Sequence, residues 1–147
     1  MTQESGSIND NDLTDPVSTF RLNNPQSIIM AHLNVNSVRL KFKEILPWMS
    51  NDLIHVLSLT ETKLDESTKD AVFTKDLSNY TLYRNDRNAH GGSIMCMVKS
   101  CIPQTARPDI SYNEHGIESL VVELRVKSNK WSYFTYQNLP TCTLIYT

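Results

Sequence analysis

The sequence predicts an α/β fold in which a strand, a helix and a second strand are followed by antiparallel strands. Three patterns support this prediction: short apolar runs at residues 27–35 and 53–59, a helical apolar period between them, and alternating apolar residues at 117–126. The chain has 147 residues, of which 39% are hydrophobic and 20% charged, as is typical of one globular domain. A strand, a helix and a strand in this order imply a parallel unit with a right-handed crossover.

The chain divides into three parts by composition. Residues 1–26 are rich in Ser, Thr, Asn and Asp, so we expect a flexible polar tail. The domain itself is expected to span residues 27–136. Residues 137–147, "QNLPTCTLIYT", form a divergent end to which the sequence assigns no clear role.

The helix of the strand–helix–strand unit follows the first strand, "SIIMAHLNV", directly. Its apolar residues fall on one helix face and charged residues fill the other face. The apolar residues are Val38, Phe42, Ile45, Leu46 and Met49. Asn36 or Ser37 can cap the helix, and Pro47 should close or kink it near its end.

Downstream of the second strand, "LIHVLSL", strands and turns are expected. The predicted strands lie at residues 81–84, 93–99, 117–126 and 131–136. We expect a turn at 85–92 and a loop at 103–116, because turn-forming residues gather there.

Charge, cysteines and hydropathy exclude several classes of protein. The formal net charge is −2, which is not the basic footprint of a nucleic-acid-binding domain, although an enzyme can bind through a local patch and a metal. Cys96, Cys101 and Cys142 are odd in number and irregular in spacing, which favours reduced thiols over a disulfide framework or a zinc site. We find no apolar run of about 18 residues and no signal-peptide pattern, so we expect an intracellular, non-secreted protein without a membrane partner.

Polar residues follow both strands of the parallel unit. The first strand ends on Asn34 and Asn36, and the second ends on Glu61. Ligands of open α/β sheets collect beyond the carboxyl ends of parallel strands, and carboxylate and amide oxygens suit Mg²⁺ or Mn²⁺. By position alone, a Glu at a strand end is usually just solvated, and an Asn there often caps the next helix.

Three stretches, "AHLNVNSVR", "LSLTETKLD" and "YRNDRNAHGGS", resemble in this order the endonuclease domain of non-LTR retrotransposons. That domain belongs to the endonuclease/exonuclease/phosphatase superfamily, of the apurinic-endonuclease type. The resemblance covers residues 28–126 and extends weakly to 136. It implies a partial two-layer α/β sandwich whose second half is missing. It also implies that Glu61 is the principal metal ligand, with Asn34 at the metal or phosphate and Asn36 where relatives often carry Asp.

The resemblance further implies contacts with DNA. Arg84 and Arg87 can touch phosphate, with solvated turn arginines as the alternative, and His90 opens the glycine-rich strand start "HGGS". Tyr136 corresponds to the tyrosine that orients the scissile phosphate in relatives, unless Tyr133 takes that place. Relatives nick DNA by Mg²⁺-dependent hydrolysis to prime reverse transcription, and a nuclear location follows from the resemblance.

Two later motifs of the family, Gly-Asp-Phe/Leu-Asn and Ser-Asp-His, do not occur in this sequence. These motifs supply the general base, so we expect the chain alone to be inactive. One alternative is a non-catalytic relic or binding module, with weak or no DNA binding and no obligate protein partner. Another is a phosphatase of the same superfamily, which would share Asn34 and Glu61.

Overall fold

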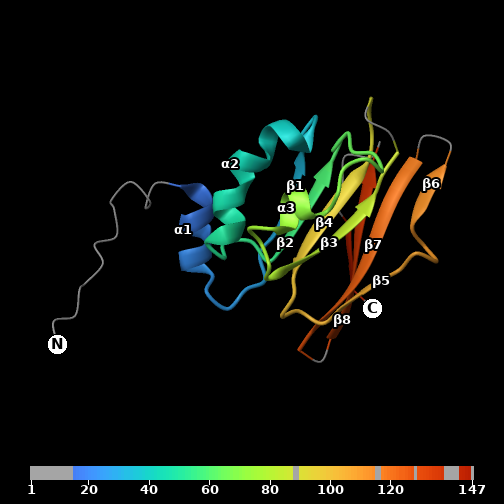
Figure 1. Ribbon diagram of the computed structural model, residues 1–147. Helices are drawn as coiled ribbons and strands as arrows, with labels where there is room; N and C mark the ends of the chain where they lie inside the picture. The colour runs from blue at the N-terminus through green and yellow to red at the C-terminus, as the bar shows by residue number, and fades with distance from the viewer. Residues whose placement is uncertain (1–14, 88–89, 115–116, 128, 138–142, 147) are drawn as a thin grey trace.

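The computed structural model describes residues 15–87, 90–114, 117–127, 129–137 and 143–146, the last two ranges by their backbone. Figure 1 shows helices on one face of a first sheet and a second sheet on its other face. The helices are α1 (Pro16–Asn23), α2 (Val38–Ser50) and α3 (Ala71–Thr74). The strands are β1 (Met30–Asn34), β2 (Val56–Thr60), β3 (Tyr80–Asn85), β4 (Ile94–Lys99), β5 (Gln104–Ala106), β6 (Tyr112–Glu114), β7 (Ile117–Val126), β8 (Asn129–Gln137) and β9 (Thr143–Tyr146).

The first sheet contains the predicted parallel unit. Its strand order is β1-β2-β4-β3, with β1 parallel to β2 and β4 antiparallel to both of its neighbours. Asn34 is the register partner of Thr60, so β1 and β2 end level with each other. All five residues of β2 are buried, because both faces of this central strand are covered. The strand–helix–strand prediction is confirmed.

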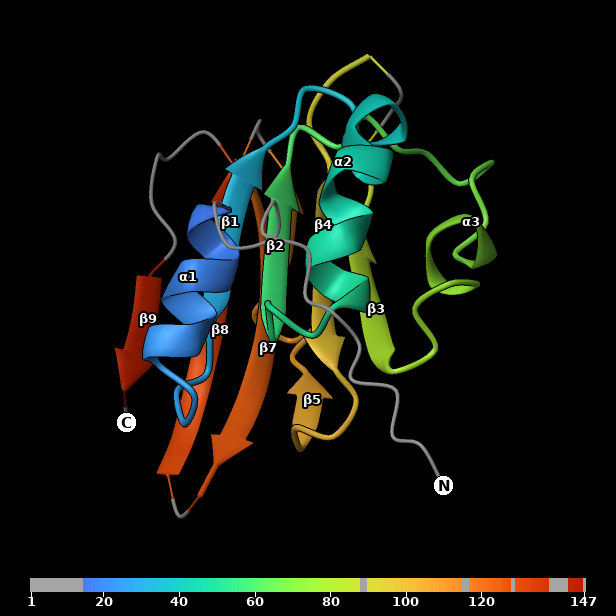
Figure 2. The ribbon, with the colours of Figure 1, turned by 90° about the vertical axis from the view of Figure 1, so that its left-hand side faces the viewer.

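Helix α2 covers the outer face of this sheet with its apolar side (Figure 2). Ser37 occupies its N-cap position but makes no side-chain cap hydrogen bond. The Val38 amide instead donates to Thr62 O at 3.1 Å. Pro47 does not end the helix, which continues to Ser50. Pro47 lies in the last turn, where few helical hydrogen bonds follow it.

The second sheet has the order β5-β7-β8-β9, with β6 paired to β7. Residues 103–116, predicted as a loop, contain β5 and β6, which pair with β7 at Gln104↔Leu124 and Tyr112↔Ser119. These short polar strands form because β7 offers them hydrogen-bond partners. Their own sequences lack the alternation of apolar and polar residues that predicts a strand. Strand β9 and the one-turn helix α3 were not predicted either.

Two apolar cores lie on the two faces of the first sheet. The outer core joins the sheet to the helices and contains Ile45, Met49, Leu57, Leu59, Leu64 and Phe73. The inner core joins the two sheets and contains Val56, Ile94, Cys96, Val98, Leu120, Val122 and Leu124. Each such side chain contributes about 1.5–3 kcal/mol when fully buried, so both layers of contact hold the sheet in place.

Residues 16–23 depart from the expected flexible tail, because they form α1. Asp15 is the N-cap residue and accepts a hydrogen bond from the Ser18 amide at 3.0 Å, and Pro16 suits the first helical turn. Val17 packs against the outer core. Residues 1–14 lie outside the described part of the chain. None of the described helices is long and apolar enough to cross a membrane.

Candidate functional site

The candidate site lies where β1 and β2 end, and we call it the site end: residues 34–37, 61–63 and 91–93. Figure 2 shows the two strands side by side and ending together. The site end gathers six residues with positive φ: Asn36 (44°), Ser37 (100°), Glu61 (56°), Lys63 (54°), Gly92 (77°) and Ser93 (70°). Elsewhere in the described residues only Asp52 and Lys127 have positive φ. Backbone strain of this kind gathers at functional sites, so this concentration supports a functional role.

Backbone hydrogen bonds join the three segments of the site end. The Ser37 amide donates to Glu61 O at 2.8 Å, which links the end of β1 to the end of β2. The Thr62 and Lys63 amides donate to Ser93 O and Gly92 O, at 3.2 and 3.1 Å. Backbone hydrogen bonds between the segments therefore hold the left-handed residues in place.

The predicted metal ligands come together at this end. Asn34 and Asn36 are exposed, and the Asn36 amide donates to Asn34 Oδ1 at 3.3 Å. Glu61 is half-buried, and its Oε2 accepts from the Gly92 amide at 3.0 Å, which orients the carboxylate. The amide oxygen of Asn34 has a second lone pair, so its local hydrogen bond is compatible with metal ligation.

The donor set fits a hard cation such as Mg²⁺, which is held in proteins by one or two carboxylates with water and phosphate completing its shell. Within the described residues there is no group of three or more His, Cys, Asp and Glu that could hold a metal. Glu61 with the amide oxygen of Asn34 is thus a minimal set of oxygen ligands.

Glu118 is a second carboxylate at this end, and the sequence analysis missed it. Its side chain is fully buried, and Oε2 accepts from the Ser93 amide at 2.7 Å. Burial raises the pKa of Glu118 and the charge of Glu61 adds to this, against lowering by the Ser93 amide and Arg87. The signal was present: in "IESLVVEL", Glu118 shares the inward parity of Leu120, Val122 and Leu124.

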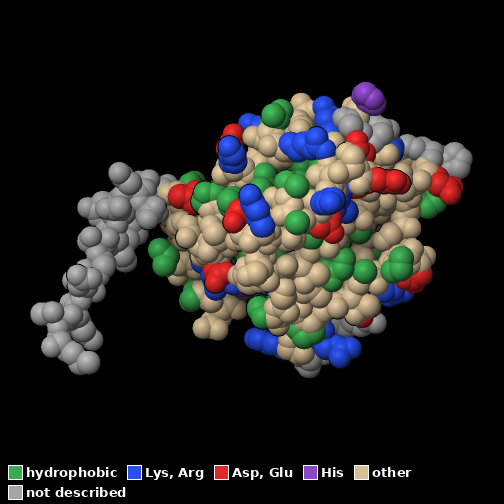
Figure 3. Space-filling model, in the orientation of Figure 1, with side chains coloured by type: hydrophobic (Ala, Val, Ile, Leu, Met, Phe, Trp, Pro, Cys, Tyr) green, Lys and Arg blue, Asp and Glu red, His purple; other side chains and the backbone are tan. Residues whose placement is uncertain are grey.

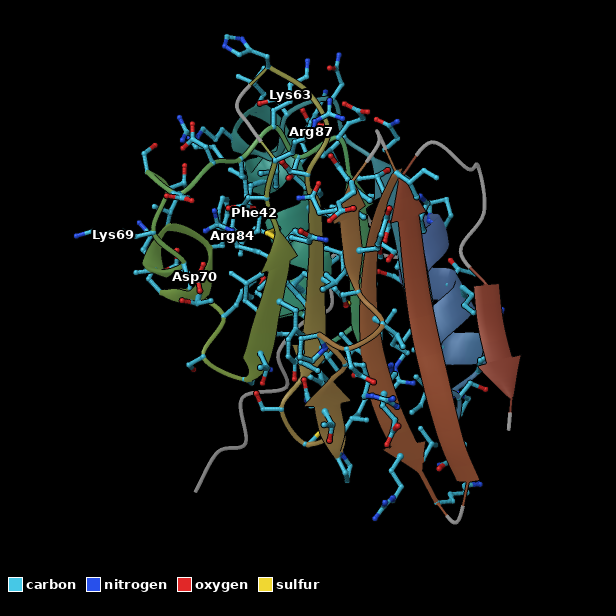
Figure 4. The ribbon with its side chains drawn as sticks, turned by 90° about the vertical axis from the view of Figure 1, so that its right-hand side faces the viewer. Phe42, Lys63, Lys69, Asp70, Arg84 and Arg87 are labelled. Carbon is cyan, nitrogen blue, oxygen red and sulfur yellow. The ribbon has the colours of Figure 1, made fainter. Side chains whose placement is uncertain are left out.

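Two arginines predicted to contact phosphate lie in different surroundings (Figure 4). Arg84 donates to both oxygens of Asp86, to Asp70 and to the carbonyls of Asp65 and Thr68. These five acceptors match the five N–H groups of a guanidinium, so Arg84 joins β3 to the loop before α3. A phosphate contact by Arg84 stays an untested prediction.

Arg87 is more exposed than Arg84 and lies beside the site end, near Gly91 and Gly92. Its side chain is 40% exposed, against 11% for Arg84. Its Nε lies 3.2 Å from Glu118 Oε1, without the geometry of a hydrogen bond. An arginine held at one nitrogen and open to solvent can present its other N–H groups to an anion.

Two further predicted contact residues are less well defined. His90 is exposed on the turn before Gly91. Tyr136 lies in β8 opposite Ser119, on the second sheet, and its side chain falls outside the described part of the chain. The predicted roles of both residues stay predictions.

Glu61 lines neither of two cavities found among the described residues. A cavity of about 200 Å³ beside α2 includes Asn34, Lys41 and Trp48. A larger one of about 320 Å³ lies between β3 and the β5–β6 region, away from the predicted ligands. Figure 3 shows Lys and Arg side chains interspersed with Asp and Glu on its face of the molecule. The candidate chemistry is therefore assigned to the strand ends, where Asn34 also lines the smaller of these two cavities.

Comparisons with known proteins agree with the predicted fold class. No protein-family model matches the chain, and no curated protein matches it significantly in sequence. The chain is similar in structure to the 3′ phosphatase NExo from Neisseria, bound to a product DNA hairpin, with a TM-score of 0.51 and 14% identity. An AP endonuclease from Archaeoglobus fulgidus also matches, with a TM-score of 0.48 and 13% identity. Each match covers 71% of this chain and 39% of the solved chain, so the chain spans about two fifths of their length.

The likeness to the 3′ phosphatase defines the class of fold. The chain has part of the endonuclease/exonuclease/phosphatase-type fold, the fold class that the sequence predicted. At 14% identity the likeness concerns the fold alone.

Proposed function

We propose that this chain is the N-terminal part of a DNA phosphodiester hydrolase domain of the non-LTR retrotransposon type, with Mg²⁺ or Mn²⁺ at Glu61. The observation that carries the proposal is the site end itself. Glu61, with a left-handed backbone and a hydrogen-bonded carboxylate, and the exposed residue Asn34 lie at the carboxyl ends of two adjacent parallel strands. The motifs "LNVNS" and "TETKLD", which contain Asn34 and Glu61, resemble those of retrotransposon endonucleases and favour that branch of the superfamily.

The residues have distinct roles in this proposal. Glu61 and Asn34 hold the cation, and Asn36 flanks them. A bound cation supplies charge stabilisation to a phosphoryl oxygen. Arg87 and His90, at the same end, contact the DNA backbone, where neutralised phosphates set affinity rather than sequence choice. A nuclear location belongs to the same proposal.

The chain alone is proposed to bind the cation without cutting DNA. Phosphodiester hydrolysis needs an activated water and leaving-group support besides charge stabilisation. The motifs that supply them in the family do not occur in these 147 residues. The purified chain is expected not to nick supercoiled plasmid in Mg²⁺, and nicking that Glu61→Ala removes would overturn this part of the proposal.

Calorimetric titration with Mg²⁺ tests the metal site directly. We expect heat of binding from the wild-type chain and none from Glu61→Gln, which keeps the shape of the side chain but removes its charge. Glu66→Gln is the matched control, because Glu66 is an exposed carboxylate five residues along the chain. Equal Mg²⁺ binding by wild type and Glu61→Gln would contradict a metal site at Glu61.

The alternative function is a non-catalytic binding module, and the same missing motifs favour it. The two are separated by adding Mg²⁺ to the chain during DNA binding. A metal-dependent gain in affinity that Glu61→Gln abolishes supports the hydrolase-type site. DNA affinity that changes neither with added Mg²⁺ nor with Glu61→Gln supports the non-catalytic binding module.

A further inference from the structure

A buried carboxylate next to the site end has no part in the proposed metal site. Glu118 comes from β7 of the second sheet, whereas Glu61 follows β2 of the first sheet. Its side chain is 0% exposed, and burying a carboxylate is costly unless it is paired and hydrogen-bonded. Two buried side-chain oxygens of the described residues have no hydrogen-bond partner, and both lie at this end: Glu118 Oε1 and Thr62 Oγ1.

Consecutive amides connect the two carboxylates. The Gly92 amide donates to Glu61 Oε2 at 3.0 Å, and the Ser93 amide donates to Glu118 Oε2 at 2.7 Å. A Cβ added at Gly92 would lie 2.5 Å from Glu118 Oε1, so the backbone approaches Glu118 as closely as only glycine allows. Any movement of Glu118 therefore reaches the amide that orients Glu61.

Arg87 lies between the two acids. Its Nε is 3.2 Å from Glu118 Oε1. A Cβ added at Gly91 would be 3.6 Å from Arg87 Nη2 and 3.9 Å from Glu61 Oε2, so the guanidinium and the Glu61 carboxylate flank the same residue. A guanidinium that turned fully onto Glu61 would compete with a divalent cation for the same carboxylate.

We propose that Glu118 is a positioning residue for the cation site at Glu61, acting through Arg87 and through the Gly92–Ser93 amides. The buried carboxylate holds the guanidinium by its Nε and fixes the turn, so Glu61 keeps the orientation that a cation needs. This inference rests on the proposed metal function of Glu61. Glu118 itself touches neither substrate nor cation in this account.

Metal-free NMR spectra test the positioning role first. Glu118→Gln keeps an acceptor for the Ser93 amide and removes the charge that faces Arg87. We expect the Arg87 Nε–H and Gly92 N–H resonances to shift. Glu123→Gln is the matched control, since Glu123 lies on the same strand and pairs with Arg107, and it should move neither resonance. Unchanged Arg87 and Gly92 resonances in Glu118→Gln overturn the inference.

Mn²⁺ affinity gives the second readout, in the full chain. We expect Glu118→Gln to weaken binding about tenfold, a coupling within the usual range for contacting groups. Adding Arg87→Gln to Glu118→Gln removes the competing cation and should restore affinity to within about twofold of wild type. A purely packing role for Glu118 predicts no such restoration.

The outcomes separate this inference from the proposed function. If wild type shows no Glu61-dependent Mn²⁺ binding, the proposed function fails and this inference fails with it. If wild type binds through Glu61 and Glu118→Gln binds equally well, only the positioning role is overturned. The same holds if the double variant stays as weak as Glu118→Gln.

Discussion

The two ends of the first sheet are built differently. At the site end, residues 34–37, 61–63 and 91–93 combine left-handed backbone with the Glu61 carboxylate, and the buried Glu118 beside them has a carboxylate oxygen without a hydrogen bond. At the opposite end, which comprises residues 52–55, 79–80 and 99–100, Asp52 alone has positive φ, and ordinary hydrogen bonds and an ion pair hold the segments together. Tyr80 Oη donates to Ile54 O at 2.6 Å, and Lys99 Nζ lies 2.9 Å from Asp52. The site end therefore concentrates left-handed backbone beside a buried carboxylate, whereas the opposite end is closed mainly by ordinary hydrogen bonds and an ion pair.

The largest expected effect is a loss of folding stability when a residue of the site end is substituted. Gly92→Ala should destabilise the fold by about 2–4 kcal/mol, because it adds a left-handed penalty and an overpacked contact. Gly92 has φ 77°, and the new Cβ would lie 2.5 Å from Glu118 Oε1. Chemical denaturation measures the loss. Gly91→Ala is the control: its Cβ would meet ordinary contacts at 3.6 Å and beyond, so the two variants should differ clearly. Equal stability would show that the turn is not tightly fixed.

A smaller loss of stability is expected from a substitution at the opposite end of the sheet. Tyr80→Phe should cost about 1–3 kcal/mol, since it removes the Tyr80 hydroxyl that donates to the buried Ile54 carbonyl, whereas the Met49 carbonyl keeps the Asp52 amide as a donor. Thermal or urea unfolding gives the value. Mg²⁺ binding should be unchanged, because this end has no part in the candidate site. A loss of Mg²⁺ affinity in folded Tyr80→Phe would contradict the division between the two ends.

The smallest effect concerns pH, and it also belongs to the opposite end. His55 Nδ1 accepts from the Ile29 amide at 3.0 Å, which requires the unprotonated nitrogen. Burial lowers the pKa of His55 below 6.5, with help from Arg21 and Lys99 and against Asp52. The unfolded chain therefore binds a proton first as the pH falls, so this contribution to stability is complete above about pH 6.5 and is lost below it.

The difference between wild type and His55→Asn isolates that contribution. The wild-type chain also has His32, whose pKa is lowered by burial in the same sense, and Glu118, whose raised pKa acts in the opposite sense. Urea midpoints measured from pH 7.5 to 5.5 should fall less steeply for His55→Asn. Parallel curves would show that His55 does not couple folding to protons.

The sequence predicted the parts of the fold that have a clear period. The strand–helix–strand unit and β7 follow from apolar spacing, and the position of Asn34 and Glu61 at the same edge of the sheet follows from parallel pairing. Strands β5 and β6 depend on the edge of β7 and have no period of their own. Glu118 was missed because a carboxylate in an alternating strand is usually solvated, and only its inward parity marks it as buried. Arg84 and Arg87 have different surroundings because of tertiary contacts, which the sequence around each residue does not predict.

Paramagnetic broadening by Mn²⁺ tests the central claim most directly, because it reads both ends of the sheet in one spectrum. In amide spectra of the wild-type chain, sub-stoichiometric Mn²⁺ should broaden residues 34–37, 61–63 and 91–93 first and leave residues 79–80 and 99–100 sharp. Glu61→Gln should abolish the selective broadening. Selective broadening elsewhere, or broadening that persists in Glu61→Gln, would contradict a cation site at the end of the parallel strands.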